Sequence, residues 1–156
     1  MLSCLSRERD LRGHVAGKGW AHAVAHAADA LEELALCPEL GEESLLDMLR
    51  VIRETVVGAS VVFVDEEDER LVTAILSAIQ RQVLAKADVT QWISGFVSFE
   101  LPPTYQEWLR KKTNIKHFMR SLYFRSLYRG VIELFEPALG QTLQEISNRR
   151  IPSTYF

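Results

Sequence analysis

Apolar residues recur every three or four positions along most of the chain, which is the spacing of one face of an α-helix. The breaks in this pattern fall where proline ends a helix, as at Cys37-Pro38 and Glu136-Pro137. The pattern predicts helices over residues 19–36, 42–57, 65–85, 89–99, 104–135 and 138–148. The fifth of these helices, 104–135, is expected to bend near Thr113-Asn114.

The segments between these helices carry weaker signals. The β-branched run 61–64 resembles a strand, but no second strand is found to pair with it, so we expect an extended connector and no convincing strand in the chain. Three glycines in 12–19 indicate a plain turn before the first helix, without the spacing of a phosphate-binding loop. Asp65 is expected to cap the third helix, and the tail 151–156 is expected to be loose.

Consecutive helices with short connections predict a single all-α domain over residues 1–156. Two arrangements satisfy this pattern. One consists of stacked antiparallel helical hairpins, as in a fragment of a HEAT- or armadillo-like α-solenoid, and the other is a helical bundle.

Composition narrows the class of protein. The chain has 156 residues, a formal net charge of -3 and two cysteines, Cys4 and Cys37, so a disulfide-rich scaffold is excluded. Charged residues appear near the N-terminus before any apolar run, and we therefore expect no signal peptide. The longest apolar stretch, 55–64, is about half of a membrane span. We expect a cytoplasmic protein that does not bind membranes.

The first predicted helix carries the most informative polar pattern. At about 100° per residue, His22, His26 and Asp29 fall on one side of the helix, with Lys18 close to the same arc. Trp20 falls on the opposite, apolar side. The histidines are therefore expected to face away from the core.

Two histidines four residues apart on a helix can bind one metal ion. Asp29 would be a third ligand or would orient His26 through a hydrogen bond. The candidate divalent-metal site is therefore His22, His26 and Asp29. A polar pocket without metal, and a solvated face with each histidine paired to a carboxylate one turn away, remain as alternatives.

Five acidic residues, 65–69, open the third predicted helix. They could bind a hard cation such as Ca²⁺ or Mg²⁺, but EF-hand spacing is absent, and the helix dipole alone favours acids there. Asp68 aligns with the apolar residues of its helix and is predicted to point inward, where a carboxylate needs a partner. The candidate partners are a loop N–H group, Arg12, Lys18 or a histidine.

Residues 110–129 contain seven basic residues and no acidic ones. Aromatic residues are interleaved with them, a composition that can grip nucleic acid by stacking and phosphate contact. Alternatively, the aromatic residues belong to the core and some basic residues neutralise residues 66–69 within the fold. The candidate nucleic-acid contacts are Arg110, Lys111, Lys112, Lys116 and Arg120.

Three phrases of the sequence together resemble the bacterial domain-of-unknown-function family 2785: RGHVAGKGWAHAVAHAADAL, FVDEEDERLVTAIL and NIKHFMRSLYFRSLY. The resemblance implies an all-helical, HEAT- or armadillo-like fold and no established activity. Family members are usually longer, so we expect a version without some N-terminal helices, whose open apolar face would favour self-association. The resemblance also suggests that one set of polar residues belongs together: Lys18, Trp20, His22, His26, Asp29, Glu67, Asp68 and Arg70.

Three functions remain open. The first is a non-enzymatic binding module whose polar groove binds a protein partner or a small anionic ligand. The second is a metal-dependent, hydrolase-like enzyme that uses His22, His26 and Asp29. The third is nucleic-acid binding through residues 110–129. No catalytic residue is assigned. The groove candidates are Lys18, Trp20, His22, His26, Asp29, Asp68 and Arg70.

Overall fold

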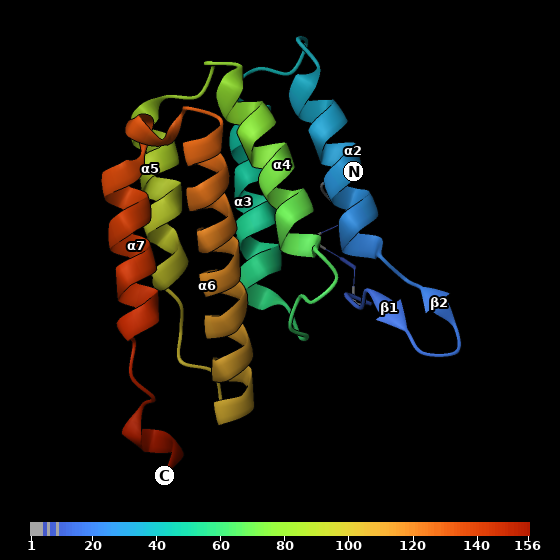
Figure 1. Cartoon of the computed structure of the whole chain (residues 1–156), viewed down its shortest axis with the longest axis vertical. Coiled ribbons are helices and arrows are strands. Elements are labelled where there is room, and N and C mark those ends of the chain that lie inside the picture. The colour runs from blue at the N-terminus through green and yellow to red at the C-terminus, as the bar shows by residue number, and fades with distance from the viewer. Residues whose placement is uncertain (1–4, 6, 9) are drawn as a thin grey trace.

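The computed structural model describes residues 5, 7, 8 and 10–156, which form a small β-hairpin followed by six α-helices (Figure 1). The all-α prediction is therefore confirmed apart from the hairpin. The elements are β1 (His14–Val15), β2 (Gly19–Trp20), α2 (Ala23–Leu36), α3 (Glu42–Gly58), α4 (Glu67–Gln80), α5 (Lys86–Ser94), α6 (Tyr105–Tyr128) and α7 (Glu136–Asn148), with the 3₁₀ turns η1 (Gly95–Val97), η2 (Ile132–Leu134) and η3 (Ser153–Tyr155).

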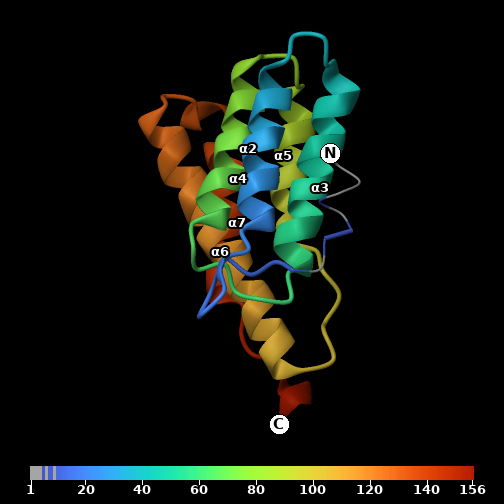
Figure 2. The ribbon, with the colours of Figure 1, turned by 90° about the vertical axis from the view of Figure 1, so that its right-hand side faces the viewer.

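The helices lie roughly along the long axis of the molecule, and successive helices run in opposite directions (Figures 1 and 2). Helix α2 packs against α4, and α4 packs against α6. On the other side of this row, α3 contacts α5, and α5 contacts α7. Because the odd and even helices run in opposite directions, the N-terminal ends of α2, α4 and α6 lie toward the same end of the molecule, and the hairpin lies at the start of α2 (Figure 1).

The core lies between the helices and is formed by the apolar faces that the sequence pattern predicts. Its aromatic centre is Trp92, Phe96 and Phe118, with the ring of Phe96 stacked on that of Phe118 at 5.2 Å between centroids. The indole N–H of Trp92 donates to the carbonyl oxygen of Leu49 at 2.6 Å, so its one polar group is satisfied inside the core.

The predicted helix over 19–36 begins later, because residues 12–22 form a hairpin. β1 and β2 pair antiparallel, and Gly17 in the turn between them and Gly19 at the start of β2 both have positive φ. Such backbone angles cost glycine little but interrupt a helix. Trp20 therefore lies on the hairpin and is 63% exposed, and its predicted place on an apolar helix face was wrong. The expectation of no strand was also wrong, although the turn itself was correctly predicted.

The predicted bend near Thr113-Asn114 is also wrong, since α6 is a continuous helix. The side chain of Asn114 does not compete for its own helix backbone. It accepts from the N–H of Phe63 at 3.0 Å and donates to the carbonyl of Val61 at 2.8 Å. These two bonds hold residues 61–64 as the extended connector that was predicted in place of a strand.

The ends of other elements differ in detail. Helix α4 begins at Glu67 with Glu66 as its N-cap, so Asp65 is not the cap. The tail is not loose, because the hydroxyl of Tyr155 donates to the carbonyl of Pro102. Cys4 and part of the N-terminal segment that argued against a signal peptide lie outside the described residues, while Cys37 is a free thiol. Among the described residues, no helix combines the length and the apolar character that crossing a membrane requires.

Candidate functional site

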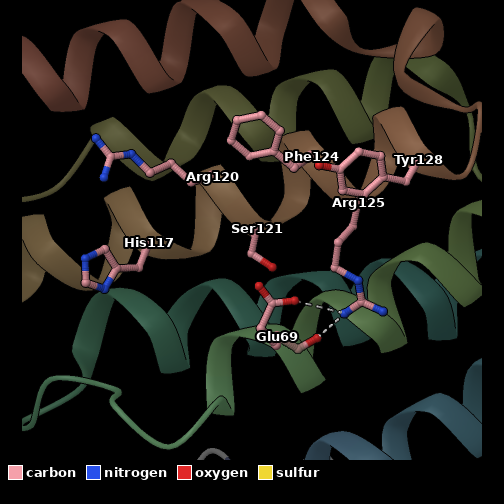
Figure 3. A pocket seen from close by; sticks show the side chains of 7 residues that line it. All are labelled: Glu69, His117, Arg120, Ser121, Phe124, Arg125 and Tyr128. Atoms are coloured by element: carbon pink, nitrogen blue, oxygen red, sulfur yellow. Dashed lines mark hydrogen bonds and ion pairs between the residues drawn. The ribbon is translucent and has the colours of Figure 1, made fainter.

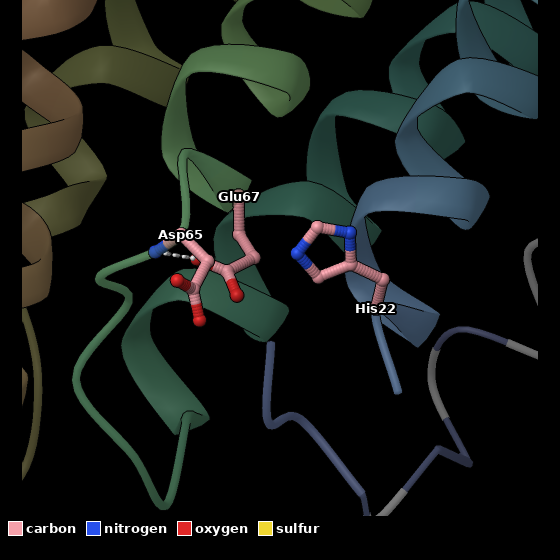
Figure 4. A group of neighbouring side chains, drawn as sticks. All are labelled: His22, Asp65 and Glu67. Carbon is pink, nitrogen blue, oxygen red and sulfur yellow. Dashed lines mark hydrogen bonds between the residues drawn. The ribbon is translucent and has the colours of Figure 1, made fainter. Parts of the chain in front are cut away.

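Polar side chains gather where α2 and α4 begin. His22 lies just before α2, Asp65 lies just before α4, and Glu67 is the first residue of α4. Each of these side chains offers one atom that could bind a metal ion, an imidazole nitrogen or a carboxylate oxygen. These three atoms lie within 4.8 Å of one another (Figure 4). Glu67 is only 1% exposed, whereas His22 and Asp65 are half-buried. We call this group the His22–Asp65–Glu67 cluster.

Backbone contacts fix the cluster. The N–H of Asp65 donates to Oε2 of Glu67 at 2.9 Å, and the N–H of His14 donates to Oδ2 of Asp65 at 2.8 Å. His22 and Glu66 both have positive φ, at 45° and 65°. Non-glycine residues in this left-handed region are uncommon and occur often at functional sites. The loop conformation therefore determines where the imidazole and both carboxylates point.

A series of aromatic rings leads from the hairpin to α2. The ring centroids of His14 and Trp20 are 4.8 Å apart, and those of Trp20 and His22 are 4.2 Å apart. The ring of His26 follows at 6.3 Å from that of His22. His14 and Trp20 are exposed, so the hairpin presents an imidazole and an indole to solvent beside the cluster.

The other predicted groove residues lie apart from this cluster. Lys18 is exposed in the hairpin turn, and His26 is exposed on α2. Asp29 forms an ion pair with Arg70 at 2.7 Å, which joins the surfaces of α2 and α4. The structure therefore brings His22 together with Asp65 and Glu67, and metal binding by the set His22, His26 and Asp29 stays a prediction.

Asp68 was predicted to point inward, but it does not point fully into the core. The deeply buried acidic residue at the start of α4 is Glu67. Asp68 is half-buried and lies near His117 of α6. Burial raises the pKa of the Asp68 carboxyl, and the smaller influence of His117 opposes that shift.

We expect Asp68→Asn to raise the free energy of unfolding at neutral pH, by less than about 1 kcal/mol, because solvent screens a half-buried group. The pKa of Asp68 is higher in the folded state than in the unfolded state. The carboxyl therefore favours the fold at low pH, and this contribution is lost as the pH rises through the folded-state pKa. The advantage of the variant should shrink between about pH 7 and about pH 3, as measured by urea unfolding.

The control for this prediction is Glu43→Gln, which removes an exposed carboxylate from the first turn of α3. It should show no comparable gain at neutral pH. A loss of stability in Asp68→Asn at neutral pH would contradict the assigned direction of the pKa shift.

A second site lies between α4 and α6 and has a volume of about 610 Å³. In Figure 3, Ser121 and Arg125 point from α6 toward Glu69 of α4. Arg125 donates to the backbone carbonyl of Glu69 and lies 3.5 Å from its Oε2 atom. We call this the α4–α6 groove, and it is lined by Glu69, His117, Arg120, Ser121, Phe124, Arg125 and Tyr128.

The basic residues of segment 110–129 contact different parts of the chain. Lys112 donates to the carbonyl of Arg149 at 2.6 Å, and Arg129 donates to the side chain of Gln80 at 3.0 Å. Lys111 lies 5.4 Å from the centre of the Phe99 ring, a cation–π contact. The contact between Arg125 and Glu69 agrees with the expected neutralisation of residues 66–69.

Several site residues escaped the sequence analysis. Asp65 was assigned to a helix cap, and Asp65 and Glu67 were considered as cation ligands only as members of the acidic run 65–69, without His22. The one local signal was the acidic run 65–69, which does not say which carboxylate turns back toward His22. Gly13 also belongs to the cluster, because a Cβ atom there would lie 2.1 Å from Oδ2 of Asp65.

The fold and these two sites define an all-α protein with a partly buried cluster of potential ligands and a surface groove. The chain belongs to the family described as "Protein of unknown function (DUF2785)", whose model matches residues 1–124. The matched range contains the whole His22–Asp65–Glu67 cluster and part of the α4–α6 groove. No curated protein and no solved structure matches the chain.

Proposed function

We propose that this protein is a non-enzymatic binding module, built from stacked helical hairpins, that binds an acidic segment of a partner protein in the α4–α6 groove. The observation that carries the proposal is the combination of cations and exposed rings in that groove. Arg120, Phe124 and Tyr128 are exposed, and His117 and Arg125 line the same groove.

The packing of the helices supports a hairpin stack. Each helix packs on the helix that comes two places later in the chain: α2 on α4 and α4 on α6. In the same way, α3 packs on α5 and α5 on α7. In α-solenoids of the HEAT type, each hairpin likewise packs on the next and leaves one side of the stack for binding. The α4–α6 groove lies between two helices of the first row.

The chemistry of the groove favours an acidic peptide segment with an apolar side chain. Carboxylates of such a segment would pair with Arg120, and its apolar side chain would pack on Phe124 and Tyr128. The rings of Phe124 and Tyr128 are stacked with centroids 6.5 Å apart, which gives a continuous apolar surface. Arginine and tyrosine are also the residue types that carry most of the binding energy at protein interfaces.

Two observations favour peptide binding in this groove over serine-dependent catalysis or nucleic-acid binding there. The Oγ atom of Ser121 is buried and has no hydrogen-bond partner among the described residues, so no base is placed to activate it as a nucleophile. Nucleic acid requires several cations free to contact phosphates. Lys112, Arg125 and Arg129 instead donate to groups of the chain itself.

The proposal is tested by fluorescence anisotropy with a short labelled peptide in which Glu and Asp residues flank one Phe. We expect saturable binding that weakens as salt screens the charges. Arg120→Ala and Tyr128→Ala should each raise Kd at least about tenfold, which corresponds to the loss of one strong interface contact.

Arg50→Ala is the matched control. Arg50 is an exposed arginine of α3 that pairs with Asp47 and Glu54 and does not line the groove. Its loss should leave Kd unchanged. Equal weakening by Arg50→Ala and Arg120→Ala, no binding of the peptide by the wild-type protein, or binding of a single-stranded oligonucleotide in its place would overturn the proposal.

A further inference from the structure

The His22–Asp65–Glu67 cluster is not used by the proposed binding function, and among the described residues no ion pair balances the charge of its two carboxylates. Glu67 is almost completely buried beside a second carboxylate, that of Asp65. Each carboxylate accepts one backbone N–H group. A buried carboxylate requires a compensating charge, and two adjacent carboxylates require it more strongly.

The third member of the cluster offers an unused ligand atom. The Nε2 atom of His22 is buried and has no hydrogen-bond partner among the described residues. Figure 4 shows the imidazole turned toward Glu67 and Asp65. A buried polar atom without a partner is costly and is rare in folded proteins. A cation bound between the three side chains would satisfy this nitrogen and both carboxylates at once.

The surrounding backbone closes tightly around the carboxylates. A Cβ atom on Gly13 would lie 2.1 Å from Oδ2 of Asp65 and 2.6 Å from Oε1 of Glu67. The loop that contains Gly13 is tied to the start of α2, because Ala21 donates to Gly13 and His22 donates to Arg12. The left-handed conformations of His22 and Glu66 are therefore part of a tightly packed loop structure around the two carboxylates.

We infer that His22, Asp65 and Glu67 form a binding site for a divalent transition-metal cation such as Zn²⁺ or Mn²⁺. One imidazole nitrogen and two carboxylate oxygens are a donor set for these ions, whereas Ca²⁺ and Mg²⁺ prefer oxygen ligands alone. Ligand atoms about 3.3 Å apart would fit Zn²⁺ at its usual bond lengths. The present spacing of up to 4.8 Å would have to close by side-chain rotation when the cation binds.

The bound cation would join the hairpin side of α2 to the start of α4. His22 lies next to β2, and the two carboxylates belong to the connector and first turn of α4. Binding to the folded state alone stabilises that state by mass action. With the free metal about one hundredfold above Kd, we expect the melting temperature to rise by about 5–10 °C.

The test uses the whole 156-residue chain without a histidine tag, freed of metal with a chelating resin. Isothermal titration with ZnCl₂ and MnCl₂ should give one saturable site for at least one of the two ions. Glu67→Gln and His22→Asn should each raise Kd at least about tenfold, because each removes one ligand atom. Asparagine tolerates the left-handed backbone at this position, and circular dichroism verifies that both variants fold.

His26→Ala and Asp29→Asn are the matched controls, because these side chains are exposed and lie outside the cluster. Both should retain the wild-type Kd and thermal shift. The inference is overturned if neither ion binds the wild-type protein with one-to-one stoichiometry, if Glu67→Gln binds as tightly as wild type, or if the two control variants lose binding to the same extent. None of these outcomes depends on the α4–α6 groove.

Discussion

Replacing Phe118 by alanine is expected to lower the free energy of unfolding by about 3–5 kcal/mol. Phe118 is fully buried, and its ring contacts those of Phe96 and Trp92 at centroid distances of 5.2 and 6.2 Å. The variant loses the burial of the ring, these aromatic contacts, and the packing around the cavity that remains. Urea unfolding followed by circular dichroism and tryptophan fluorescence measures the loss.

Phe124→Ala removes a phenylalanine from the same helix and serves as the control. Its side chain is 49% exposed, so the expected loss is less than about 1 kcal/mol. The same variant should weaken peptide binding in the α4–α6 groove, because Phe124 lines that groove. Equal destabilisation by the two variants would show that the aromatic centre of the core is misplaced.

The positions of most helices could be predicted because their apolar faces repeat over several turns. In α3, the buried residues Leu45, Leu49, Ile52 and Val56 follow that repeat, and the observed helix differs from the prediction by one residue at its end. Proline correctly marked the end of α2, at Cys37-Pro38, but the predicted end at Glu136-Pro137 was wrong, because α6 already ends at Tyr128 and Pro137 lies in the first turn of α7. These signals are local, so the sequence contains them directly.

The hairpin could not be predicted in this way. Ala21, Ala23 and Ala25 favour a helix, and strands of two residues are too short to show a pattern. The left-handed backbone of His22 has no sequence signature, because such conformations in non-glycine residues depend on the surrounding structure. Because His22 precedes α2 and has a left-handed backbone, its side chain does not follow the helical periodicity that grouped it with His26 and Asp29.

The candidate sites depended on tertiary contacts even more strongly. His22 and Glu67 are far apart in the sequence and meet only because α2 packs against α4. The net charge of residues 110–129 was visible in the sequence, but the choice between internal and external partners was not. Arg125 reaches α4, whereas Arg120 stays exposed, and only the rotation of α6 against its neighbour decides between them.

Asn114→Ala should lower the free energy of unfolding by about 2–4 kcal/mol, although alanine is the better helix former. Asn114 is 1% exposed, and its amide satisfies both the N–H of Phe63 and the carbonyl of Val61. Alanine would leave the buried N–H of Phe63 and the partly buried carbonyl of Val61 without their partner. The connector 61–64 should then loosen, and the amide of Phe63 should exchange with deuterium faster than in the wild-type protein.

Gln106→Ala, an exposed amide-to-alanine change on the same helix, separates this effect from helix propensity. We expect it to leave both the unfolding free energy and the exchange of Phe63 close to the wild-type values. If Asn114→Ala slowed or left unchanged the exchange of Phe63, the amide of Asn114 would not be what holds the connector. Because that connector leads directly to Asp65, a loosened connector should also raise the Kd of the proposed metal site while Gln106→Ala leaves it unchanged.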